Sequence, residues 1–119
     1  MFEIRFGVPE MLYLWNDLQS NFEKGFLNKT DRQLYKKLHK TLILLSINPF
    51  HNSLNSHEIE VLSKRYGIRV WQSYLENKKP AAGRIFWVYY PEGSITIIGI
   101  EPHPNDTKHS YDKIKLSSI

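Results

Sequence analysis

The sequence predicts a single α+β domain in which two helices pack on one face of an antiparallel sheet. An alternating apolar segment lies near the N-terminus, two long segments with helical periodicity follow, and three short segments rich in β-branched and aromatic residues come last. This separation of helices from strands along the chain is typical of an α+β layer. At 119 residues, the chain is long enough to bury one hydrophobic core. We therefore expect one domain over residues 1–119.

The first half of the chain predicts a strand followed by two helices. Residues 2–7 (FEIRFG) alternate between apolar and charged side chains, as a half-buried strand does, and residues 8–26 place apolar side chains on one helical face. Thr30 and Gln33 have the spacing of a capping box, which predicts that the second helix begins there. Pro49 predicts that it ends near residue 48. The expected buried stripe of this helix consists of four leucines, Leu34, Leu38, Leu42 and Leu45.

The second half of the chain predicts a three-stranded meander. Residues 50–67 show no clear period and are rich in Asn and Ser, so we expect a connecting segment with at most one helical turn. Residues 68–76, 83–93 and 94–101 predict strands. Alternation in the middle strand puts Ile85, Trp87 and Tyr89 on the face expected to meet the helices. Arg84 is then expected on the opposite, open face.

The amino-acid composition excludes several classes of function. The chain has no cysteine, which excludes disulfides, thiolate metal sites and a cysteine nucleophile. Its N-terminal residues, MFEIRFGVPE, lack the apolar segment of a signal peptide, and no apolar run is long enough to span a membrane. We therefore expect a cytoplasmic protein with no membrane partner.

The positive charge is concentrated in one segment. The net charge is +4, and residues 61–90 alone carry six basic residues against one acidic residue, a local charge of +5. Tryptophans, tyrosines and a phenylalanine are interleaved with them, as in surfaces that bind RNA. A solvated basic edge is the alternative interpretation. The candidate RNA-binding residues are Lys64, Arg65, Arg69, Lys78 and Lys79.

The order of elements and several local strings carry a family resemblance. A short strand, two helices ended by Asn-Pro, and a basic meander are together similar to the RelE/ParE superfamily of toxins from bacterial toxin–antitoxin pairs. The local strings that carry the resemblance are HNSLNSHEI, GIRVWQSYL, GRIFWVYY and GIEPHPND. The resemblance covers nearly the whole chain, through order and spacing rather than one diagnostic motif. It implies a RelE-like fold and a ribosome-dependent endoribonuclease that cleaves mRNA, needs no cofactor and is neutralised by a cognate antitoxin protein.

The resemblance also implies site residues. Arg84 stands where RelE-like toxins carry an arginine on the middle strand, and His103 corresponds to the histidine near the end of the last strand in YoeB-like and HigB-like members. Tyr111 corresponds by distance to a C-terminal tyrosine. This chain continues further past the histidine than YoeB-like toxins do, which leaves the roles of Lys108, His109 and Tyr111 open.

RNA cleavage without a metal gives these residues distinct tasks. A base must take the proton of the ribose 2′-OH, cations must stabilise the charge on the phosphate, and an acid must protonate the departing 5′-oxygen. His103 suits the base or the acid because histidine titrates near neutral pH. Arg84 suits the phosphate because its guanidinium matches two phosphate oxygens. Lys108 would add a second positive charge, and Tyr111 would donate to an oxygen or stack on a base.

Each candidate also has a structural interpretation. His103 lies between two prolines, a context typical of turns, and Tyr111 has the spacing to pack a short terminal helix. Arg84 has Glu76 and Glu101 as alternative partners across the sheet, although a surface ion pair would contribute little stability. Residue types alone leave these alternatives open.

A metal site and two other functions are alternatives to a metal-independent nuclease. His57 and Glu58 begin like a zincin motif, but Val61 stands where the second histidine is required, and a site shared by His51, His57 and His103 would need the fold to bring them together. We therefore expect no metal. The alternatives to the nuclease are a ParE-like inhibitor of DNA gyrase and a non-catalytic module that binds nucleic acid or the ribosome.

Overall fold

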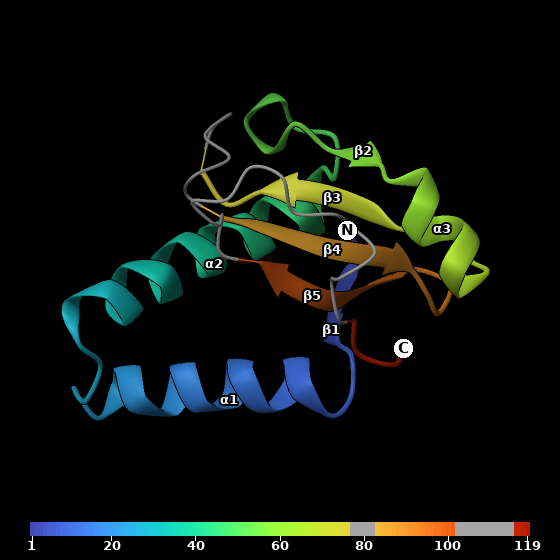
Figure 1. Ribbon diagram of the computed structural model, residues 1–119. Coiled ribbons are helices and arrows are strands. Elements are labelled where there is room, and N and C mark those ends of the chain that lie inside the picture. Colours follow the sequence, from blue (N-terminus) through green and yellow to red (C-terminus); the bar gives the residue numbers. More distant parts are fainter. Residues whose placement is uncertain (77–82, 102–115) are drawn as a thin grey trace.

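The computed structural model describes residues 1–76, 83–101 and 116–119, and these form an α+β fold (Figure 1). This confirms the predicted class. The described elements are, in chain order, β1 (Glu3–Phe6), α1 (Glu10–Glu23), α2 (Lys29–Ile47), a 3₁₀ turn η1 (Asn52–Leu54), β2 (His57–Glu58), α3 (Glu60–Tyr66), β3 (Trp71–Tyr74), β4 (Arg84–Tyr89) and β5 (Ser94–Glu101). In this part of the chain, no helix is both long enough and apolar enough to cross a membrane.

The sheet is mixed, with strand order β1-β5-β4-β3-β2. Strands β2 to β5 pair antiparallel, as expected for the meander, whereas β1 pairs parallel with β5, from Glu3 opposite Ser94 to Phe6 opposite Ile97. The prediction of a wholly antiparallel sheet was therefore wrong for the N-terminal strand. No hairpin turn joins β1 to its neighbour, so the direction of β1 depends on where the two long helices return the chain and not on local turn chemistry.

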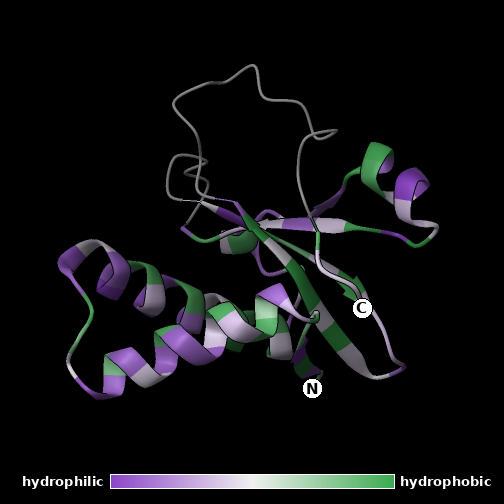
Figure 2. Cartoon of the chain, turned by 60° about the horizontal axis from the view of Figure 1, so that its bottom comes forward, coloured by the Kyte–Doolittle hydropathy of each residue, from purple (hydrophilic) through white to green (hydrophobic). Residues whose placement is uncertain are grey.

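Helices α1 and α2 lie side by side and cover one face of the sheet (Figures 1 and 2). The expected face of β4 meets them, because Ile85 and Trp87 are fully buried in the same cluster as Leu38 and Leu45 of α2. Tyr89, at the end of that face, is 39% exposed. Burial of the large aromatic and aliphatic side chains in this layer is the main source of the fold's stability.

The ends of the first two helices differ from the prediction. Helix α1 is shorter than residues 8–26, and the flanking Val8 and Phe26 are exposed. Helix α2 begins at Lys29 because Asn28 caps it: the Asn28 side chain accepts a hydrogen bond of 2.8 Å from the backbone N–H of Asp31. The capping box expected at Thr30 was therefore wrong by two residues. Helix α2 ends at Ile47, as Pro49 predicted.

A third helix occupies the segment that was predicted to be a connection. Residues 50–67 contain η1, β2 and α3, and α3 ends where Gly67 adopts a left-handed conformation with φ of 71°. Seven residues are too few to show a clear helical period, so the sequence pattern did not reveal α3. Strands β3 and β4 are also shorter than expected, because residues 68–70 and 90–93 lie outside them.

Helix α3 changes the interpretation of the second sheet face. Ile59 and Leu62 pack there against Phe86 and Val88, in a second buried cluster separate from the first. The part of this face that carries Phe86 and Val88 is therefore covered by α3. Arg84, at the other end of β4, is itself only 5% exposed, so the prediction that it lies on an open face was wrong.

Candidate functional site

Four polar side chains lie on the sheet face opposite α1 and α2. Three of them are in register across the sheet, and the fourth, His57, is displaced along the strands and lies opposite Gln72. Arg84 on β4 lies directly opposite Tyr74 on β3 and Glu101 on β5. His57 on β2 lies opposite Gln72 on β3, and its ring centroid is 6.4 Å from that of Tyr74. Because directly opposed residues of antiparallel strands share a face, these side chains all belong to one surface. We call His57, Tyr74, Arg84 and Glu101 the polar row.

Arg84 is a buried cation held in a defined position. Its Nη1 donates a hydrogen bond of 3.2 Å to Oε1 of Gln72, which is itself 1% exposed. Its Cζ lies 5.6 Å from the centroid of the Phe86 ring. A guanidinium fixed in this way has lost most of its conformational freedom before any ligand binds, which favours tight recognition of a planar or tetrahedral anion.

Of the two acidic partners expected for Arg84, the strand register places Glu101 directly opposite it. Glu101 is its neighbour on β5, while the carboxylate of Glu76 lies 3.2 Å from Nζ of Lys37 on α2. The row thus places a carboxylate beside the arginine from the strand that leads toward His103.

His57 has a defined tautomer. Its Nδ1 lies 3.1 Å from the backbone carbonyl oxygen of Asn55. A carbonyl oxygen only accepts hydrogen bonds, so in neutral His57 the proton is on Nδ1 and the lone pair is on Nε2. Asn55 adopts a left-handed conformation, with φ of 47°, that turns its carbonyl toward the ring. The side chain of His57 is exposed. In the sequence, this residue stood out only as part of an incomplete metal-binding motif.

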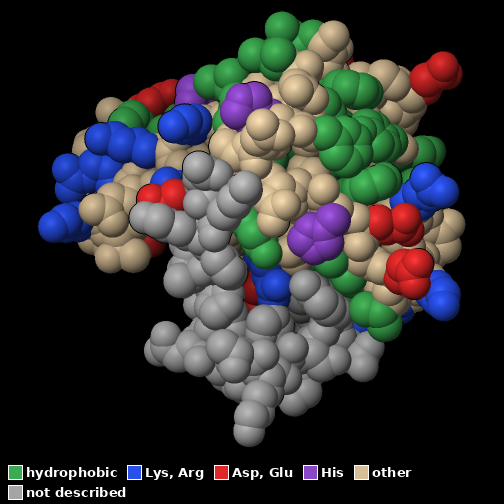
Figure 3. Space-filling model, turned by 90° about the horizontal axis from the view of Figure 1, so that it is seen from above, with side chains coloured by type: hydrophobic (Ala, Val, Ile, Leu, Met, Phe, Trp, Pro, Cys, Tyr) green, Lys and Arg blue, Asp and Glu red, His purple; other side chains and the backbone are tan. Residues whose placement is uncertain are grey.

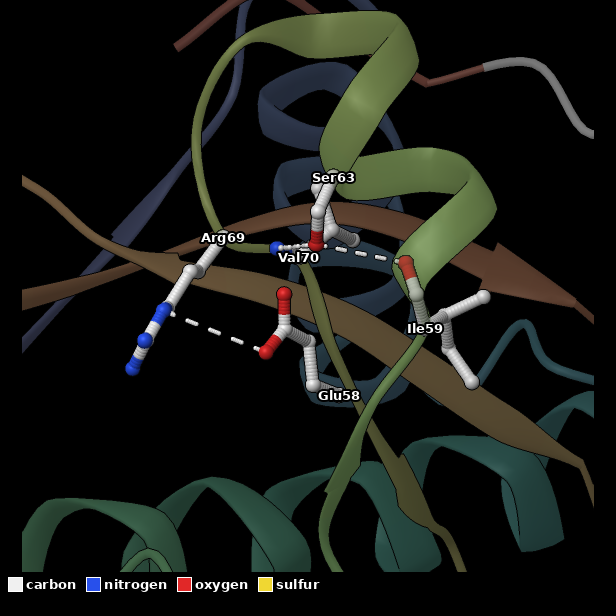
Figure 4. Close-up of polar contacts among 5 residues, drawn as sticks. All are labelled: Glu58, Ile59, Ser63, Arg69 and Val70. Carbon is white, nitrogen blue, oxygen red and sulfur yellow. Dashed lines mark hydrogen bonds and ion pairs between the residues drawn. The ribbon is translucent and has the colours of Figure 1, made fainter.

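Three predicted RNA-binding residues lie on α3 or just after it. Lys64 and Arg65 are in the last turn of α3, Arg69 follows the helix, and all three are exposed. Arg69 Nε lies 3.9 Å from a carboxylate oxygen of Glu58, and Ser63 Oγ accepts a hydrogen bond of 2.8 Å from Val70 N–H while donating one of 3.2 Å to the carbonyl of Ile59 (Figure 4). The Ser63 contacts hold the backbone of α3 against Val70, just before β3.

Helix α2 carries a second basic surface, which the net charge of residues 1–60 does not reveal. Residues 1–60 carry no net charge, but α1 has three acidic residues and no basic one, while α2 has five basic residues and only Asp31 as an acid. Lysines and arginines accordingly gather on one side of the molecule seen in Figure 3. Between this helix and β3 lies a groove of about 230 Å³ that Lys37, Lys40, Tyr74 and Glu76 help to line. The groove extends from the α2 cations to one member of the polar row.

Several predicted site residues lie outside the described residues. These are Lys78, Lys79, His103, Lys108 and Tyr111, together with His109. In the sequence, Lys78 follows Tyr74 by four residues and His103 follows Glu101 by two. Among the described residues, no group of three His, Asp or Glu side chains is arranged to hold a metal ion.

The arrangement combines a guanidinium that can bind an anion with groups that can transfer protons. Arg84 provides the guanidinium. The proton-transfer groups are the imidazole of His57, the phenol of Tyr74 and the carboxylate of Glu101, and two exposed basic surfaces flank them. In comparisons with known proteins, no family model, no curated protein and no solved structure matched the chain.

Proposed function

We propose that this protein is a metal-independent endoribonuclease that cleaves mRNA on the ribosome and thereby inhibits translation. The observation that carries the proposal is the buried, prepositioned guanidinium of Arg84, aligned with proton-transfer groups on the neighbouring strands. A phosphate bound by Arg84 would develop negative charge as the ribose 2′-oxygen attacks it, and a fixed guanidinium stabilises that charge without reorganising. His103, Lys108 and Tyr111 remain further candidates for the catalytic set.

The basic surfaces support a polyanionic substrate. Lys64, Arg65 and Arg69 lie at the end of α3 on one flank of the polar row, and the cations of α2 lie on another. Cations on two flanks of a reactive centre favour binding of a strand that passes through it, since each phosphate contact releases counterions. Lys78 and Lys79, which lie outside the described residues, remain candidates for RNA binding.

The finer classification follows the resemblance. We propose a RelE-like arrangement of the fold and a role as the toxin of a toxin–antitoxin pair, with a cognate antitoxin as protein partner and the cytoplasm as the place of action. An antitoxin encoded beside this gene would relieve growth arrest caused by expression of the protein. Absence of any growth arrest would contradict the toxin assignment.

The activity is tested by following message integrity in a purified translation system. Wild-type protein should cleave the message, and Arg84→Lys, which keeps the charge but loses the two-pronged guanidinium, should reduce the rate by about 10²-fold or more. Arg5→Ala is the matched control, because Arg5 is an exposed arginine on β1 of the same sheet. Circular dichroism establishes that each variant is folded.

Two results would assign a different function to the protein. Intact message at all protein concentrations, with salt-dependent binding to ribosomes, would identify a non-catalytic binding module. Intact message together with inhibition of DNA supercoiling would identify a gyrase inhibitor. Equal cleavage by wild type and Arg84→Lys would remove Arg84 from the catalytic set.

A further inference from the structure

We propose that His57 is the general base that takes the proton from the ribose 2′-OH. This inference rests on the proposed ribonuclease function and names a residue that neither the sequence motifs nor the family resemblance assigned to catalysis. It is carried by three features of the described structure, namely the tautomer of His57, its place in the polar row and its exposure.

The tautomer prepares His57 to accept a proton. The contact of 3.1 Å between Nδ1 and the Asn55 carbonyl places the proton on Nδ1, so the lone pair on Nε2 faces away from that anchor. When Nε2 takes a proton, the positive charge on the ring strengthens the bond from Nδ1 to the carbonyl. The backbone carbonyl thus does what a carboxylate does for a catalytic histidine elsewhere: it fixes the ring and stabilises the imidazolium.

The second feature is the relation of His57 to Arg84. Tyr74 stands between them in the polar row, with its ring at 74° to that of His57 and its backbone directly opposite Arg84. Neighbouring strands are about 4.8 Å apart, so the backbones of β2 and β4 are roughly 10 Å apart. Side chains that reach toward each other from that distance can contact adjacent groups of one nucleotide. Arg84 would hold the phosphate and His57 would contact the ribose on its side.

The surroundings of His57 set its charge environment. Along the polar row it faces Tyr74, with Arg84 and Glu101 on the strands beyond. The adjacent Glu58 is beside Arg69 at 3.9 Å, so its charge is partly balanced. His57 itself is exposed, unlike Arg84, and is accessible to a large substrate. A base must reach the proton that it removes, and this residue combines access with a fixed ring.

The proposed step is an internal transesterification, in which the bond that forms to phosphorus replaces the bond that breaks. Nε2 of His57 takes the proton from the 2′-OH, the 2′-oxygen forms a bond to phosphorus, and the bond from phosphorus to the 5′-oxygen breaks. The 5′-oxygen leaves with a proton from an acid, for which His103 is the sequence candidate, or from water. The products are a 2′,3′-cyclic phosphate and a 5′-hydroxyl, with no change of oxidation state.

The test compares His57→Ala with His39→Gln, a matched change at an exposed histidine on α2 that stacks near Trp15 and Tyr35, away from the polar row. Rates are measured in single turnover on ribosome-bound message, with ribosome binding measured separately. We expect His57→Ala to bind normally and to cleave about 10²–10⁴-fold more slowly, and added imidazole to restore part of the rate. The cleavage rate of the wild type should fall at acid pH, where a general base is protonated, and this decline should be absent in His57→Ala. His39→Gln should match wild type.

Each outcome decides between the proposals. If wild type cleaves and His57→Ala cleaves at a similar rate, His57 is not the base, while the ribonuclease function and the role of Arg84 stand. A loss of rate that imidazole does not restore would assign His57 a structural role and would also contradict the inference. If wild-type protein cleaves no message, the proposed function itself fails.

Discussion

The hydrogen bond between Arg84 and Gln72 should be one of the largest single polar contributions to stability in this fold. Both side chains are almost fully buried, at 5% and 1% exposure, and Nη1 and Oε1 are 3.2 Å apart. A hydrogen bond to a charged group contributes about 1.5–3 kcal/mol, and a buried group that loses its partner costs a similar amount. We predict that Arg84→Met and Gln72→Met each lower the free energy of unfolding by about 2–3 kcal/mol. The double variant should lose less stability than the two single variants lose together. This is because neither polar side chain is then left buried without the other.

A double-mutant cycle measures this coupling directly. Urea unfolding of the wild type, both single variants and the double variant can be followed by tryptophan fluorescence, since Trp87 is fully buried in the core. We expect a coupling energy of about 1.5–3 kcal/mol. Additive effects, within about 0.5 kcal/mol, would refute the view that Gln72 positions Arg84.

Three further predictions concern the cap, a titrating tyrosine and the basic surface. Asn28→Ala should destabilise the protein by about 1 kcal/mol in urea unfolding because it removes the cap of α2, whereas Thr30→Ala should have little effect. Burial raises the pKa of Tyr89 above its ordinary value of 10.0, so the unfolded chain ionises first as pH rises. The free energy of unfolding of wild type should therefore fall relative to that of Tyr89→Phe above pH 10, and a constant difference from pH 8 to pH 11 would contradict this. Replacing Lys64 and Arg65 by alanine should weaken binding to single-stranded RNA and reduce its slope against log salt by about 1.4, and an unchanged slope would place the RNA elsewhere.

The long periodic segments were predictable from sequence, because their patterns extend over enough residues. The second helix, its end before Pro49 and the inward face of β4 all follow from apolar spacing and proline chemistry. Helix α3 and strand β2 were missed because seven and two residues are too short for a period to stand out. The parallel pairing of β1 was not predictable from local pattern, since it depends on how distant elements pack.

The candidate site was predictable only in part. Arg84 was found through its place on a strand of the meander, but its burial was not, because its contacts with Gln72 and the Phe86 ring depend on cross-strand register and side-chain packing. Tyr74 and His57 join the site through cross-strand register, which no linear motif encodes. A signal for His57 was present in retrospect, as an Asn two residues before a histidine at a strand start, but this pattern alone has many other meanings. The basic surface of α2 was hidden because the acidic α1 cancelled it in the charge count.

End-group analysis of the cleaved message distinguishes metal-independent transesterification from other routes of cleavage. We predict that ribosome-bound message incubated with wild-type protein acquires new ends that carry a 2′,3′-cyclic phosphate and a 5′-hydroxyl, and that Arg84→Lys forms them at least about 10²-fold more slowly. Intact message, or fragments with 5′-phosphate ends formed equally by both proteins, would contradict it.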